Sequence, residues 1–215
     1  MKIGVFGTGM VGHTLATKLV DLGHDVRMGS RTKDNPKAVA WVEKGGARAS
    51  QGTFADAAAF GELLVNCTEG QASLAALHAA GAQNLSGKVL IDVSNPLDFS
   101  RGMPPSLTVS NTDSMGEQLQ REFPELRVVK ALNTINCSIM VDPASVAGGD
   151  HDVFVSGNDA SAKGDVTKLL RSFGWRSIVD LGDITTARGT EAYLLLWIRL
   201  YGALGTPSFN VKIVR

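Results

Sequence analysis

The stretch that decides the fold is K-I-G-V-F-G-T-G-M-V-G, residues 2–12 of a chain of 215 residues. Its first part, Lys2 to Phe6, is a short apolar run typical of a buried parallel strand. Three glycines at G-x-G-x-x-G spacing follow, and apolar residues then recur at helical spacing as far as Gly23. A second short strand is expected over residues 26–29. One contiguous run thus predicts strand, glycine turn, helix and strand.

Each glycine of this turn has its own task in a unit that binds the diphosphate of a dinucleotide. Gly7 permits the tight turn, Gly9 lets the backbone approach the phosphates, and Gly12 lets the helix pack against the strand. The pyrophosphate is then held by free backbone N–H groups at the helix N-terminus, where the helix dipole also favours it. A glycine turn alone is a weak signal, but the strand before it and the helix after it favour a dinucleotide site.

The residues after the second strand indicate which dinucleotide is bound. An NAD-binding unit usually carries Asp or Glu about 20 residues after the glycines, where it bonds the ribose 2′-OH. This chain has Ser30, Arg31 and then Lys33 there, and no carboxylate occurs before Asp34. Because a guanidinium can form paired hydrogen bonds to a phosphate, these residues predict NADP. The alternative is a solvated basic turn without a ligand.

Composition excludes several classes of function. The 21 Lys and Arg residues balance the 21 Asp and Glu residues, so the overall charge favours neither nucleic acid nor a membrane surface as a partner. Two cysteines, Cys67 and Cys137, are too few for a disulfide framework and are expected to be reduced thiols. No apolar run is long enough to span a membrane. The first strand begins at residue 2, so we expect no signal peptide and a cytoplasmic location.

Expected strands and helices alternate from Met1 to Asp180, which predicts a doubly wound, mostly parallel α/β sheet of the Rossmann type. We expect residues 1–215 to form a single domain. Beyond the first unit, the expected strands cover residues 47–50, 63–65, 88–93, 127–131, 152–156 and 176–180. The expected helices cover residues 36–44, 53–60, 71–80, 114–123 and 161–173, and residues 100–110 are expected to form a loop.

Three polar loops leave the expected strands at their carboxyl ends, the edge at which α/β proteins bind ligands. They are residues 67–70, 94–97 and 133–137, and we expect them to enclose the nicotinamide. In the second loop Asn95 and Pro96 are candidate cofactor contacts. In the third, Asn133, Thr134 and Ile135 are the candidate catalytic residues, because small, amide and aliphatic side chains suit the stacking of two flat rings. The four histidines form no cluster, so no metal site is predicted.

The last part of the chain differs from the rest. A helix is expected over residues 184–204, followed by an extended tail to residue 215. Leu194, Trp197 and Tyr201 recur at three- and four-residue spacing, and the opposite face is apolar as well, so the helix is expected to be buried on more than one face. Since one face can pack on the chain's own sheet, the other predicts a homodimer.

The opening K-I-G-V-F-G-T-G-M-V-G, the G-S-R-T after the second strand and the K-A-L-N-T-I at residues 130–135 resemble the NADP oxidoreductases that work with the deazaflavin coenzyme F-420. The resemblance extends over the full length, including the closing helix and tail. The oxidoreductase domain of the metal-reducing membrane proteins called STEAP is similar too.

The resemblance implies roles for particular residues. Thr8, Gly9, Met10 and Val11 would line the phosphates, and Ser30 and Arg31 would hold the 2′-phosphate, with Lys33 as a looser match. Cys67, Thr68 and Cys137 would lie near the nicotinamide half. The family pattern has His where this chain has Asn133 and Pro where it has Asn136, so the match is better in the NADP half than in the deazaflavin half.

The sequence therefore predicts an NADP(H)-dependent oxidoreductase that transfers hydride between NADPH and a flavin or deazaflavin. The second substrate would be F-420, FMN, FAD or riboflavin, and Asn133 favours a riboflavin-type ring at least as much as the deazaflavin. Such a transfer needs orientation and exclusion of water more than a protein acid or base. The alternatives are a reductase of a small imine or carbonyl compound, which needs a proton donor, and an NADP(H)-binding regulator without turnover. Cys67 and Cys137 are either a redox pair or, more simply, small apolar lining.

Overall fold

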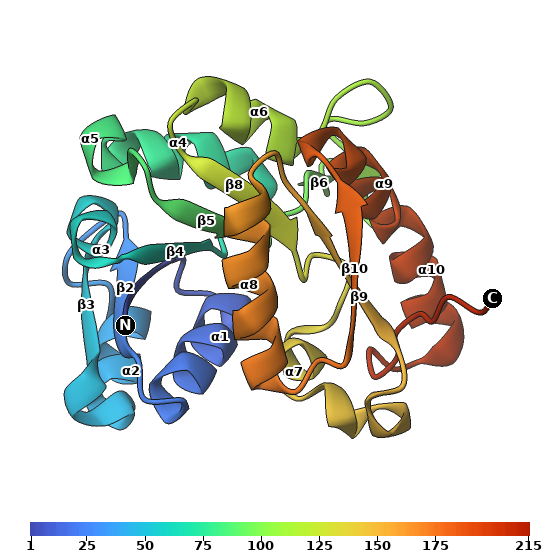
Figure 1. Ribbon diagram of the computed structural model, residues 1–215, viewed down its shortest axis with the longest axis horizontal. Helices are drawn as coiled ribbons and strands as arrows, with labels where there is room; N and C mark the ends of the chain where they lie inside the picture. Colours follow the sequence, from blue (N-terminus) through green and yellow to red (C-terminus); the bar gives the residue numbers. More distant parts are fainter.

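The computed structural model describes residues 1–215 and shows an eight-stranded sheet with helices on both faces (Figure 1). Six neighbouring strands are parallel, in the order β3, β2, β1, β4, β5 and β8. With β8 counted as the sixth strand, this is the order 3-2-1-4-5-6 of a dinucleotide-binding fold, so the predicted fold class is confirmed. From edge to edge the strands are β10 (Ser177–Gly182), β9 (Asp152–Ser156), β8 (Arg127–Ala131), β5 (Val89–Asp92), β4 (Leu63–Asn66), β1 (Lys2–Phe6), β2 (Asp25–Ser30) and β3 (Ala49–Thr53).

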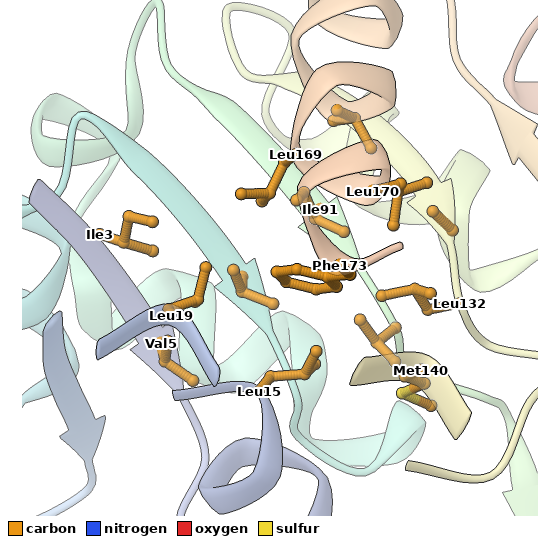
Figure 2. Close-up of a cluster of buried hydrophobic side chains, with 14 of the residues drawn as sticks. Ile3, Val5, Leu15, Leu19, Ile91, Leu132, Met140, Leu169, Leu170 and Phe173 are labelled. Atoms are coloured by element: carbon orange, nitrogen blue, oxygen red, sulfur yellow. The ribbon is translucent and has the colours of Figure 1, made fainter. Parts of the chain in front are cut away.

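Successive residues of each strand point to opposite faces, and both faces are covered. Ile3 and Val5 of β1 join a core of 29 buried residues on one face, whereas Phe6 joins a core of 17 on the other. Helices α1 (Met10–Asp21), α2 (Pro36–Gly45), α7 (Cys137–Val141) and α8 (Ala160–Phe173) cover the first face, whose central residues Figure 2 shows. Helices α3 (Phe54–Phe60), α4 (Gly70–Ala80), α5 (Ala82–Leu85), α6 (Met115–Glu122) and α9 (Ala187–Ala192) cover the second.

Local signals set several helix ends. The Thr53 hydroxyl accepts a hydrogen bond from the backbone N–H of Asp56 at 3.1 Å, and the Thr53 N–H donates to the Asp56 carboxylate at 2.9 Å, so α3 begins with a capping box. The Asn35 side chain caps α2, whose first residue is Pro36. Helix α8 ends at Gly174 in the left-handed conformation.

The sheet is mostly parallel, as expected, and its single antiparallel pair lies between β8 and β9. Strand β9 runs antiparallel to β8, and β10 is parallel to β9. A parallel neighbour needs a crossover connection that returns the chain to the starting edge of the sheet. Between β8 and β9 the chain forms only the five-residue α7 and two 3-10 turns, η2 (Pro143–Ser145) and η3 (Ala147–Gly149), so β9 starts from the edge where β8 ends.

Several short elements were shifted or missing in the sequence-based prediction. Strand β3 covers residues 49–53 rather than 47–50, because residues 46–48 form the 3-10 turn η1. The region expected to be a loop pairs β7 (Ser106–Leu107) with β6 (Leu97–Asp98), and we refer to residues 97–107 as the hairpin. Helices α5 and α7 were not predicted, since four or five residues carry too little periodicity to be recognised.

The expected closing helix is divided. A 3-10 turn, η4 (Ile184–Thr186), and α9 pack on the sheet side, and α10 (Leu194–Leu204) follows at the edge of the molecule near the C-terminus (Figure 1). Of the residues in α10 only Leu194 is buried in the single chain, whereas Leu195, Leu196, Tyr201 and Leu204 are exposed. The tail returns along β9, where the Asp152 N–H donates to the Val211 carbonyl at 3.0 Å. None of the helices combines the length and apolarity needed to cross a bilayer.

Candidate active site

A cavity of about 600 Å³ opens at the edge of the sheet where β1, β4 and β5 end. Three segments line it: residues 9–11 after β1, residues 67–71 after β4 and residues 93–100 after β5. The chain reverses its direction across the sheet between β1 and β4, and ligands of open α/β sheets bind at such a switch point. The volume lies in the usual range of small-molecule sites, so this cavity is the candidate active site.

The glycine turn has the geometry that a dinucleotide phosphate requires. Gly7 has a φ of +109°, and a Cβ at Gly12 would lie 2.2 Å from the Gly7 carbonyl oxygen, so both positions need glycine. At Gly9 a Cβ would have no atom within 4 Å, which leaves the backbone open to a ligand. No side chain caps the start of α1 at Gly9. The first N–H groups of a twelve-residue helix therefore face the cavity lined by Gly9, Met10 and Val11, as an anion requires.

The basic residues after β2 are separated by β1 from residues 67–71 and 93–100 of the cavity wall. Ser30 is buried and its hydroxyl donates to the Thr32 carbonyl at 2.5 Å, which fixes the turn. Arg31 and Lys33 are exposed and form no ion pair within the chain. They can therefore meet a phosphate bound beside β2, at a distance from the reacting end of the cofactor.

Cys67 and Thr68, which the resemblance places near the nicotinamide, lie in the cavity wall. Thr68 donates from its hydroxyl to the Asn66 side-chain oxygen at 2.7 Å, so its position is fixed from below. Burial, with a smaller contribution from the charge of Asp92, raises the pKa of the Cys67 thiol well above its usual range. Both cysteines are free thiols, and the thiol of Cys67 stays protonated at neutral pH.

Asn133 reaches the cavity only through Asn95. The Asn133 amide nitrogen donates to the Asn95 side-chain oxygen at 3.0 Å, and the Asn95 amide nitrogen donates to the Asn133 carbonyl at 2.8 Å. Asn95 is in the cavity lining, whereas Asn133, Thr134 and Ile135 are buried outside it. Pro96 and Cys137 are buried outside the lining as well, and Cys137 belongs to the core on the α1 face. Residues 133–137 therefore lie behind residues 94–97 and hold Asn95 in place.

Beneath the cavity lies a buried ion network that was not predicted from the sequence. Asn66, Asp92 and Lys130 stand side by side in the register of β4, β5 and β8. The Lys130 ammonium lies 2.8 Å from an oxygen of Asp92 and 2.8 Å from an oxygen of Glu191, and it donates to the Ser94 carbonyl at 2.5 Å. The other Asp92 oxygen accepts from Asn66 at 2.8 Å. Glu191, on α9, also accepts the N–H groups of Met115 and Gly116 at 2.8 and 3.0 Å.

Asn66, Asp92, Lys130 and Glu191 are at most 2% exposed, so the charges of the last three are paired rather than solvated. Burial by itself would lower the pKa of Lys130, but the carboxylates of Asp92 and Glu191 together raise it, so the ammonium stays charged. The network joins the segment after β5 to α9, far away in sequence. A signal was present in the sequence. Each of three buried strands carries a polar or charged residue directly after its apolar run, in LLVN, VLID and RVVKA.

The hairpin forms the outer wall of the cavity and was not predicted from the sequence either. Leu97, Asp98 and Phe99 line the cavity, and Phe99 is 55% exposed. The end of the hairpin is attached to the loop after β5 because the Thr108 N–H donates to the Pro96 carbonyl at 2.8 Å. The structure contains no group of three or more His, Cys, Asp or Glu side chains that could hold a metal ion.

Comparisons with known proteins show what this chain is similar to. Residues 2–96 match the family model described as NADP oxidoreductase, coenzyme F420-dependent. A solved protein of Arthrobacter sp. FB24, proposed to be an F420-dependent NADP reductase, is 58% identical over 100% of both chains, with a TM-score of 0.95. The F420-dependent NADP reductase of Methanocaldococcus jannaschii is 27% identical over 96% of each chain. Metalloreductase STEAP3 of Rattus norvegicus is 33% identical over 89% of this chain, which spans only 36% of that protein's length.

Proposed function

This chain belongs to the family of NADP oxidoreductases that depend on coenzyme F420, and we propose that it transfers hydride between NADPH and the flat ring of a flavin or deazaflavin. The chain is an NADP(H)-dependent oxidoreductase, and the proposal concerns its second substrate. Two of the similar proteins are named or proposed as F420-dependent NADP reductases, which supports a ring of this kind.

The observation that carries the proposal is the absence of a suitable proton donor in the cavity wall. None of the fourteen lining residues is His, Lys or Tyr. Hydrogen bonds from Ser100 lower the pKa of Asp98, so this carboxyl is ionised at neutral pH, and the raised pKa of Cys67 makes that thiol a poor acid. Reduction of a carbonyl or imine by hydride calls for a proton from a positioned group, whereas transfer between two stacked rings depends mainly on orientation.

The chain's own residues would bind and orient the cofactor. The N-terminus of α1 would hold the pyrophosphate, and Ser30, Arg31 and Lys33 would surround the 2′-phosphate. Cys67, Thr68 and Asn95 would lie around the nicotinamide. When bound, NADPH supplies a hydride, and a proton from water completes the reduced acceptor. Asn133 would act by positioning Asn95, with Thr134 and Ile135 as the wall behind it.

An acceptor screen tests this proposal. The enzyme and NADPH are mixed with riboflavin, FMN, FAD, the deazaflavin coenzyme, and a panel of imines and ketones, and NADPH absorbance is followed. We expect turnover with at least one ring acceptor and little with the imines and ketones. A preference for an imine or ketone, with no ring reduced, would refute the proposal. NADPH binding without oxidation by any acceptor would favour the regulator instead.

Two variants test the role of the third loop. Asn133→Ala removes the amide that holds Asn95, and Ile135→Trp overfills the wall behind it. We expect both to lower kcat for the ring acceptor more than they weaken NADPH binding, measured by titration. If both variants left the turnover of every acceptor unchanged, the third loop would have no part in the site.

We also propose that the protein is a homodimer through α10. Four large apolar residues of this helix are exposed in the single chain. A second copy of the helix would cover these side chains across a two-fold axis. Light scattering at micromolar concentration should report a dimer, and Trp197→Glu should give a folded monomer. A monomeric parent protein would refute this assignment.

We place the enzyme in the cytoplasm. The two free thiols suit a reducing compartment, where disulfides are rare. Fractionation of the native host, followed by immunodetection, tests this placement, and recovery from an oxidising compartment would contradict it.

A further inference from the structure

One hydroxyl group in the cavity wall has no hydrogen-bond partner in the protein. Five lining residues carry a hydroxyl or an amide, and these are Thr68, Gln71, Ser94, Asn95 and Ser100. Four of these side chains donate hydrogen bonds within the chain. The Oγ atom of Ser94 forms none, although this residue is only 3% exposed. A buried hydroxyl without a partner costs free energy, so this one indicates a hydrogen bond to a ligand of the cavity.

The backbone of Ser94 is fixed on both sides by the buried ion network. The Ser94 N–H donates to Asp92 at 3.2 Å, and the Ser94 carbonyl accepts from the Lys130 ammonium at 2.5 Å. The other two hydrogens of this ammonium point to Asp92 and Glu191. Because both peptide groups are occupied beneath the cavity, only rotation about the Cα–Cβ bond remains. This rotation brings the hydroxyl to one of three staggered positions, from which it can meet a ligand.

The place of Ser94 in the sheet indicates which part of the cofactor reaches it. The N-terminus of α1, where the pyrophosphate is expected, follows β1, and Ser94 follows β5. Strands β1 and β5 are separated by β4 alone, which corresponds to about 9.5 Å. The nicotinamide is joined to the pyrophosphate through one ribose, so the nicotinamide end of NADP(H) is the part that extends along this edge towards Ser94.

We propose that the Ser94 hydroxyl binds the carboxamide group of the nicotinamide. A hydroxyl has one donor hydrogen and two acceptor lone pairs, and a carboxamide has a carbonyl that accepts and an amino group that donates, so the two groups match in either orientation. Asp92 and Lys130 are then positioning residues, because they fix the backbone from which this hydroxyl extends. The assignment concerns the cofactor and does not depend on which acceptor is reduced.

The substitution Ser94→Ala should have different effects on the free and the cofactor-bound protein. Without cofactor, it removes a buried hydroxyl that has no partner, so the Tm should stay unchanged or rise slightly. With cofactor, it removes one neutral hydrogen bond, so the Kd of NADP⁺ and of NADPH should rise by roughly two- to tenfold. A serine that only supported the fold would give a lower Tm of the free protein instead.

Calorimetric titration of the whole protein with three ligands tests the assignment. The ligands are NADP⁺, NADPH and 2′-phospho-ADP-ribose, which is the cofactor without its nicotinamide. Ser94→Ala and Ser94→Cys should both bind the first two ligands more weakly and the third as the parent does. Cysteine fills the space of serine but is a weak donor, so agreement of the two variants assigns the loss to the hydroxyl rather than to volume. The control is Ser145→Ala, which removes an exposed hydroxyl that bonds the Asp142 carbonyl outside the cavity.

Three results would overturn the assignment. They are equal losses of affinity for all three ligands, unchanged Kd values for NADP⁺ and NADPH, and a clear fall in the Tm of the cofactor-free Ser94→Ala protein. The acceptor screen is independent of these measurements. A failure to reduce any ring would refute the proposed function and leave the role of Ser94 standing, whereas unchanged Kd values would refute the role of Ser94 alone.

Discussion

The two halves of the candidate site are built in different ways. The cofactor half comes from one contiguous run, residues 2–33, in which strand, turn, helix and strand follow each other directly. The acceptor half combines residues 67–71 with residues 93–100 and is held from below by Lys130 and Glu191. The first half depends on short-range backbone geometry, and the second depends on contacts between distant parts of the chain.

This difference indicates how each half should respond to mutation. A change in the contiguous half should alter cofactor binding and leave most of the molecule intact, because its key residues are exposed or lie in one turn. A change in the assembled half should reduce global stability, because the supporting charges are buried in the centre of the sheet. The following predictions test this contrast, beginning with the largest expected effect.

Lys130→Met should be the most damaging of these substitutions. It leaves Asp92 and Glu191 buried without their shared cation, and breaking a buried pair in this way costs about 3–5 kcal/mol of unfolding free energy. Urea denaturation followed by circular dichroism measures the loss. Lys168→Met, which removes an exposed ion pair with Asp165, is the control and should change stability by less than about 1 kcal/mol. Equal effects of the two variants would show that the network does not support the fold.

Arg31→Ala should weaken NADPH binding and have little effect on stability. Loss of a charge-assisted contact to the 2′-phosphate costs about 1.5–3 kcal/mol, or about ten- to a hundredfold in Kd. NADH lacks this phosphate, so its Kd should hardly change. Titration by isothermal calorimetry measures both constants, and Lys37→Ala on the exposed start of α2 serves as a control. Equal losses for NADPH and NADH would contradict the assignment of Arg31.

Gly12→Ala and Gly9→Ala should differ although both lie in the same turn. At Gly12 the new methyl group would overlap the Gly7 carbonyl oxygen, so unfolding free energy should fall by roughly 1–3 kcal/mol and NADPH affinity should fall with it. At Gly9 the methyl group meets no protein atom, so stability should be kept while the approach of the phosphates is hindered. Thermal melting with and without NADPH separates the two effects. A stable Gly12→Ala variant with full affinity would contradict the packing argument.

Glu117→Gln should give a smaller effect that depends on pH. Arg188 donates to both oxygens of Glu117 and, with Ser114, lowers the pKa of this carboxyl despite its burial. A carboxyl whose pKa is lowered on folding stabilises the protein above its unfolded-state pKa, and this contribution is lost as the pH falls through the folded-state value. The parent should therefore lose stability below about pH 4.5 more steeply than the variant.

At neutral pH the same substitution should cost roughly 1–2 kcal/mol, because the hydrogen bonds lose their charged acceptor. Denaturant unfolding at a series of pH values provides both measurements, and Glu43→Gln, on an exposed helix face, should follow the parent curve. Parallel acid curves for Glu117→Gln and the parent would show that this ion pair does not contribute to the pH dependence.

The sequence alone was sufficient for the features that depend on neighbouring residues. The fold class and the glycine turn were predicted and confirmed. The NADP preference was inferred from Ser30 and Arg31, and the comparisons support NADP(H) as the cofactor. The fold class and the glycine turn are encoded by apolar periodicity and turn chemistry within windows of a few residues. Both act through local backbone geometry. The direction of β9 was not predictable in this way, since it depends on whether the connection after β8 crosses back to the starting edge of the sheet.

Only the tertiary structure showed what lines and supports the acceptor side. Asn133, Thr134 and Ile135 follow a strand at the binding edge, yet they lie behind Asn95 because the hairpin and the residues after β5 occupy the front. Lys130 and Glu191 are 61 positions apart in the sequence and meet because β8 and α9 pack together in the centre of the fold. Burial, not sequence spacing, determines which charges must pair, and burial exists only after the whole chain has folded.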